Sequence, residues 1–154
     1  MPKISYSTDA PAFARFRAHG TIRLEMDGHR LRTTATGPFN AEALAAVAEL
    51  EAQVFARMKA AGKWVEILEF RHNLLATAEA LEAFARHVER FRSKGLSPLG
   101  SAVVIDPSLE GEAIIRPQLA AAYAAAGWPC AFFTNMADAE AWADSLLDVT
   151  EPAR

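Results

Sequence analysis

The stretch from residue 64 to residue 81 carries the side chains best placed to do chemistry. The apolar run WVEILEF ends at Phe70, and Arg71, His72 and Asn73 follow at once. In α/β folds, binding sites gather where parallel strands end. The sequence therefore makes Arg71, His72 and Asn73 candidate partner-binding residues.

Two further polar side chains lie at predicted element ends. Thr77 precedes an Ala-, Glu- and Leu-rich run that is typical of a helix. A hydroxyl there caps the helix, and a phosphate there would be received by exposed N–H groups. Thr77 is therefore a candidate phosphorylation site. Asp106, at the end of SAVVIDP, is a candidate site residue, and the alternative is that it opens an Asp-Pro turn.

Catalytic carboxylates are not predicted. Glu66 and Glu69 interrupt the WVEILEF run. Residues three apart on a strand face opposite sides, so these two cannot form a close acid–base pair. We expect them to mark the exposed face and the end of the strand. An enzyme built from Glu69, His72 and Asp106 at neighbouring strand ends stays open as a third hypothesis.

Metal and cofactor motifs are absent from the sequence. The four histidines have no HxxxH or HExxH spacing, and the only cysteine, Cys130, is far from all of them. No Walker loop, GxGxxG or GxSxG motif occurs. The sequence predicts no metal, no cofactor and no catalytic residue.

Composition narrows the class of partner. The chain has 154 residues, of which 51% are hydrophobic and 23% charged, with a net charge of -3. Such a balance is that of an ordinary globular domain and disfavours nucleic acid as a partner. One cysteine excludes an internal disulfide, and no apolar run reaches the roughly 18 residues of a membrane span. We expect a cytoplasmic protein without membrane insertion.

The first clear element is a β-hairpin in TIRLEMDGHRLRTTA. Asp27-Gly28 is a strong two-residue turn signal. With the turn at these residues, Met26 pairs with His29 and Leu24 pairs with Leu31. The even-numbered side chains of the first strand then share the packed face, and the other face is exposed.

Helices and strands alternate after the hairpin. Asn40 is a good N-cap for a helix that Gly62 ends, and apolar stripes of helical period mark this helix and the next, which stops near Gly95. SAVVIDP and CAFFT are short strands, each followed by a helix. The order predicts an α/β fold with a mixed sheet, in which the strands after the hairpin are mainly parallel.

This pattern resembles the SpoIIAA-like (STAS-like, STAS/SEC14-like) family of small bacterial proteins. The stretches that carry the resemblance are LRTTATGPFNAEAL, KWVEILEF, SAVVIDP and GWPCAFFTNMADAEAWADSLL. It implies one STAS-like domain over residues 1–154, with a core at about 20–148. The family's switch site is a Ser or Thr in an Asp-Ser-Gly type motif after the central strand. Here that motif is replaced, and Thr77 is the hydroxyl available.

The resemblance implies a non-enzymatic regulatory module that acts through contacts with a protein partner. Its SEC14-like side implies an alternative, a carrier of a small apolar ligand or lipid. Six large side chains on helix faces and nearby would then line a cavity: Phe84, Val88, Phe91, Tyr123, Trp128 and Trp142. Edge strands leave both a monomer and a homodimer open.

Overall fold

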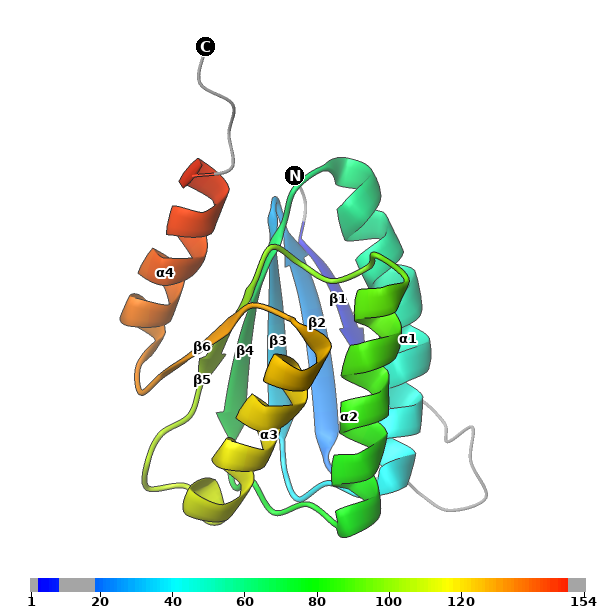
Figure 1. Ribbon diagram of the computed structural model, residues 1–154, viewed down its shortest axis with the longest axis vertical. Coiled ribbons are helices and arrows are strands. Elements are labelled where there is room, and N and C mark those ends of the chain that lie inside the picture. Colours follow the sequence, from blue (N-terminus) through cyan, green and yellow to red (C-terminus); the bar gives the residue numbers. More distant parts are fainter. Residues whose placement is uncertain (1–2, 9–18, 150–154) are drawn as a thin grey trace.

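A mixed six-stranded sheet forms the centre of the computed structural model, which describes residues 3–8 and 19–149 (Figure 1). The strands lie across the sheet in chain order. They are β1 (Ile4–Ser7), β2 (Thr21–Asp27), β3 (Arg30–Thr36), β4 (Val65–Arg71), β5 (Ser101–Val104) and β6 (Cys130–Phe133). β1, β2 and β3 pair antiparallel, whereas β3 to β6 pair parallel. The predicted α/β fold with a mixed sheet is confirmed.

Three helices cover one face of the sheet and one covers the other (Figure 1). The first three are α1 (Ala41–Ala61), α2 (Ala78–Ser93) and α3 (Glu112–Ala126). Each connects two parallel neighbours in the same direction across the sheet, and crossovers of one handedness place such helices on one face. The last helix, α4 (Met136–Val149), follows the final strand and packs on the opposite face.

The helix ends follow the predicted caps. The Asn40 side chain accepts a hydrogen bond from the backbone of Ala43, and Thr77 does the same for Ala80. Gly62 ends α1 with φ of 128°, a conformation that side-chain-bearing residues avoid. The short strand β1, Ile4–Ser7, pairs with β2 at the edge of the sheet.

The hairpin register differs from the prediction. Asp27 pairs with Arg30 and Met26 with Leu31, so the two loop residues are Gly28 and His29. Gly28 has φ of 63° and takes the first loop position, where type II′ turns require glycine. The predicted pairing was therefore wrong by two residues, since Met26 was expected opposite His29 and lies opposite Leu31. The predicted faces are right, because this slip keeps the same residues of each strand on the same side.

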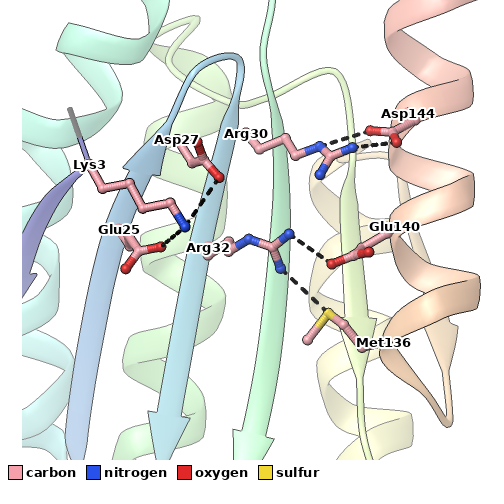
Figure 2. Close-up of polar contacts among 8 residues, drawn as sticks. All are labelled: Lys3, Glu25, Asp27, Arg30, Arg32, Met136, Glu140 and Asp144. Atoms are coloured by element: carbon pink, nitrogen blue, oxygen red, sulfur yellow. Dashed lines mark hydrogen bonds and ion pairs between the residues drawn. The ribbon is translucent and has the colours of Figure 1, made fainter. Parts of the chain in front are cut away.

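The two faces of the sheet carry different residues. Under α4 lies a small apolar cluster that includes Val65, Ile67, Ala102, Val104, Ala139 and Ala143. Beside it, Arg30 pairs with Asp144 and Arg32 pairs with Glu140 at 2.7 Å (Figure 2). The three-helix face holds the larger core, with the aromatic rings of Phe55, Trp64, Phe91 and Trp128 at its centre.

Candidate functional site

The residues predicted at the end of β4 form a turn. Arg71 is exposed and pairs with Glu69 at 2.8 Å. His72 is exposed and has φ of 73°, in the left-handed region. The Asn73 side chain is buried and accepts a hydrogen bond from the backbone of Leu75, which fixes the turn. These three residues are adjacent in sequence, but the structure does not direct them toward one common ligand position.

Thr77 and Asp106 both stabilise backbone at element ends. Thr77 is exposed, caps α2 and donates its backbone N–H to the carbonyl of Phe39. Asp106 is exposed and accepts from the backbone and hydroxyl of Ser108, which lowers the pKa of its carboxyl. Asp106 therefore takes the alternative role named above, that of opening a turn. Glu69, His72 and Asp106 line neither of the two hollows described next.

A surface groove of about 420 Å³ lies beyond the carboxyl ends of the parallel strands. The caps of three helices line it, namely Asn40, Thr77 and Gly111. Its wall also includes Leu75 and Ile114, which are 40% and 70% exposed. We call this hollow the mouth groove. Thr77 is the predicted candidate that lies in it.

A second hollow, of about 80 Å³, lies between the sheet and helices α1, α2 and α3. One buried water needs roughly 10–15 Å³ by a comparable measure, so there is room for on the order of five to eight water-sized groups. We call this hollow the inner cavity. Phe84, Val88, Tyr123 and Trp128 line it, as the carrier hypothesis requires. Phe91 belongs to the surrounding core, and Trp142 lies on the other face of the sheet.

The two hollows adjoin each other. Phe39, Ala76 and Ile115 line both the mouth groove and the inner cavity. Phe39 and Ala76 lie in loops that are joined by an isolated β-bridge, and Ile115 lies in the first turn of α3. These three side chains therefore separate the inner cavity from the surface.

Glu66 corrects one prediction and defines the polar part of the inner cavity. It was expected to mark the exposed face of its strand, but it is 4% exposed and points under the three helices. The hydroxyl of Thr33 donates to its Oε2 and the hydroxyl of Ser101 to its Oε1, both at 2.8 Å. Ser101 in turn accepts from the indole N–H of Trp128 at 2.9 Å. This chain of donors satisfies a carboxylate deep in the core.

Glu51 and His87 form a second buried polar pair on the cavity wall. Each is 7% exposed, and Oε2 of Glu51 lies 2.7 Å from Nε2 of His87. The other ring nitrogen, Nδ1 of His87, is buried and has no hydrogen-bond partner in the described part of the chain. Buried polar atoms are nearly always paired, so an unpartnered one beside a cavity points to a missing partner.

Burial shifts the pKa values of side chains that line the inner cavity. Desolvation raises the pKa of Glu66 to about 7, with the nearby Glu51 adding to the shift while the Ser101 and Thr33 hydroxyls oppose it. Desolvation also raises the pKa of Tyr123, as do Glu66, Cys130 and Glu51. Glu51, Glu66 and His87, which we call the buried cluster, thus come together with Tyr123 around one cavity. The arrangement can accept hydrogen bonds and exchange a proton near neutral pH.

The sequence did contain a signal for the buried cluster. Val47, Glu51 and Phe55 are spaced by four, so Glu51 lies on the apolar stripe of its helix. His87 likewise lies between Phe84 and Phe91 on the stripe of the next helix. Charged or titratable residues at core positions are rare unless paired. A search for such positions would have selected Glu51 and His87.

Within residues 3–8 and 19–149, no group of three or more His, Cys, Asp and Glu side chains is arranged to hold a metal ion. The same residues include no helix with the length and apolar character needed to cross a membrane.

Neither protein-family models, nor curated proteins, nor solved structures yielded a match to this chain.

Proposed function

We propose that this protein binds a small, largely apolar molecule in the inner cavity, as a non-enzymatic carrier of the SEC14-like kind. One observation carries the proposal, namely a hollow inside the main core that adjoins a groove at the surface. Protein interiors are close-packed, and apolar cavities of this kind bind small apolar ligands. Assignment to the SpoIIAA-like fold family belongs to the same proposal and rests on the sequence patterns quoted above.

Blocking the inner cavity tests the proposal. Ala80 is 1% exposed and lines the cavity, so Ala80→Leu should fill part of it. Ala85 is exposed on the same helix, and Ala85→Leu is the matched control. We expect toluene to shift amide NMR signals around the cavity in the wild type and in Ala85→Leu, but not in Ala80→Leu. The proposal fails if toluene binds nowhere, or if Ala80→Leu binds it as well as the wild type does.

A role in protein contacts is the second proposal, and the mouth groove supports it. Leu75 and Ile114 expose apolar surface beside Thr77, the hydroxyl suggested for a switch. Ile114→Lys should then prevent a partner protein from co-purifying, whereas Val149→Lys, at an exposed position on α4, should not. Equal recovery of the partner with both variants would remove the groove from this role.

A further inference from the structure

We infer that the inner cavity selects ligands whose apolar body carries a protonated amine, with the ammonium group at Glu51, Glu66 and His87. The inference rests on the proposed function, because it needs a ligand inside the cavity. It names the chemical class of that ligand. The charge, the hydrogen-bond capacity and the size of the cavity each support this ligand class.

Charge is the first step. Two carboxylates and one imidazole line the inner cavity, and the described residues of its lining include no Lys or Arg. The ion pairs of the arginines in the sheet lie on its other face (Figure 2). Glu51 has the imidazole of His87 as a partner, whereas the described hydrogen-bond partners of Glu66 are hydroxyls, and a buried carboxylate without a basic partner is costly to keep ionised. A ligand cation would supply the missing countercharge, whereas a carboxylate ligand would add a third negative group.

Hydrogen-bond capacity is the second step. The hydroxyls of Thr33 and Ser101 already donate to Glu66, and the indole N–H of Trp128 already donates to Ser101. Each carboxylate oxygen has two lone pairs, so Glu66 can accept more. In a neutral imidazole whose Nε2 proton faces Glu51, the unpartnered Nδ1 of His87 is also an acceptor. The phenol O–H of Tyr123 adds one donor to the described lining residues, acceptors still exceed donors, and the ammonium N–H groups would supply the rest.

Size is the third step. The cavity of about 80 Å³ holds on the order of five to eight water-sized groups, which suits one ring or a short alkyl chain. The mouth groove lies beyond the carboxyl ends of the strands, whereas Glu66 is the second residue of β4, near its amino end. A ligand that passes Phe39, Ala76 and Ile115 would therefore enter with its amine leading and its apolar body behind.

A panel of four probes with similar bodies tests the inference. Benzylamine, benzyl alcohol, toluene and benzoate share a ring and differ in charge and donor capacity. We expect benzylamine to bind on the order of tenfold tighter than toluene, with benzyl alcohol between them and benzoate weakest, as amide NMR titration at one pH would measure. Benzoate binding as tightly as benzylamine, or no preference between toluene and benzylamine, would overturn the inference.

Single substitutions test whether the buried cluster causes the preference for benzylamine over toluene. Glu66→Gln and Glu51→Gln keep the side-chain shape and remove one negative charge each, and either should reduce the ratio of benzylamine to toluene affinity by several-fold. Glu69→Gln is the matched control, since Glu69 belongs to the same strand and pairs with Arg71 outside the cavity. An unchanged ratio in both cluster variants would contradict the inference. Failure of all four probes to bind the wild type would instead overturn the proposed function, and the two failures are thus distinct.

Discussion

The two faces of the sheet differ in how deeply their charged side chains are buried and in how completely these side chains are paired. On the α4 face, Arg30 and Arg32 each meet a carboxylate, and all four side chains remain 28–41% exposed (Figure 2). On the three-helix face, Glu51 and Glu66 are almost fully buried beside a cavity, and among the described residues that line this cavity the basic group is the imidazole of His87. Complete, partly hydrated ion pairs join a helix to a sheet. Burying two carboxylates with one imidazole lowers the free energy of unfolding, so a gain in stability does not explain why these residues lie there.

Neighbouring residues of strand β3 show the difference between the two faces. Along β3, Arg30 and Arg32 point to α4, whereas Thr33 points inward and donates to Glu66. Side chains alternate between faces along a strand, so neighbours in sequence serve different surroundings. We therefore expect a structural role for the α4 face, and the proposed binding site lies on the three-helix face. Four predictions test this division, from the largest effect to the smallest.

Removing the imidazole should have the largest effect. His87→Ala removes a buried ring and leaves the Glu51 carboxylate without its hydrogen-bond partner, which together cost roughly 3–5 kcal/mol of unfolding free energy. Urea denaturation of the wild type and the variant measures the difference. A loss below about 1 kcal/mol would mean that water already solvates Glu51, as at a surface pair.

The free energy of unfolding should depend on pH through the ionisation of Glu66. Its pKa is raised from 4.5 to about 7 on folding, so between these values the folded chain holds a proton that the unfolded chain has lost. Stability therefore falls as pH rises through this window, by roughly 3 kcal/mol if Glu66 acts alone. The groups that face it are Thr33, Ser101, Glu51, His87, Tyr123 and Trp128.

Glu66→Gln isolates this contribution. We expect the fall in unfolding free energy between pH 5 and pH 8 to be smaller in this variant than in the wild type, because the titrating carboxyl is gone. Glu69→Gln should keep the wild-type slope, since Glu69 is only partly buried and pairs with Arg71. Parallel curves for the wild type and Glu66→Gln would show that Glu66 ionises as easily folded as unfolded.

Interrupting the donor chain should have an intermediate effect. Ser101→Ala leaves the Trp128 N–H and one Glu66 oxygen without their partner, which costs roughly 1–3 kcal/mol. The cost should be larger at pH 8 than at pH 5, because the ionised carboxylate depends more on the hydroxyl. Ser93→Ala, which removes an exposed hydroxyl from α2, serves as the control in the same denaturation series. A cost independent of pH would argue that Ser101 only fills space.

The α4 face should give the smallest effect. Asp144→Asn and Glu140→Gln each break a partly exposed ion pair, and such pairs contribute about 0–1 kcal/mol. Salt should screen this contribution, so the loss should shrink further at high ionic strength. Probe binding in the inner cavity should be unchanged in both variants. Loss of probe binding would show that the two faces are coupled and that the division drawn here is wrong.

The sequence by itself determined the local features of this protein. Element order, the caps at Asn40 and Thr77, and the packed and exposed faces of the hairpin were all predicted correctly, because each depends on residues within about one turn or one strand. The hairpin register was wrong, because each residue of β2 pairs two positions further along β3 than predicted. Turn chemistry at Gly28 fixes the register, and the alternation of apolar residues is the same for both pairings.

Only the tertiary structure decided the site. The predicted candidates near the end of β4 lie in a turn and at a helix cap, and their binding and phosphorylation roles stay predictions. The buried cluster instead joins Glu51, Glu66 and His87 from three elements. Its hydrogen bonds connect residues 33 to 36 positions apart in the chain. No local pattern encodes such a meeting, because the crossovers decide which helix faces cover which strand. Whether a charged side chain is hydrated or buried depends on that packing, and so does its chemistry.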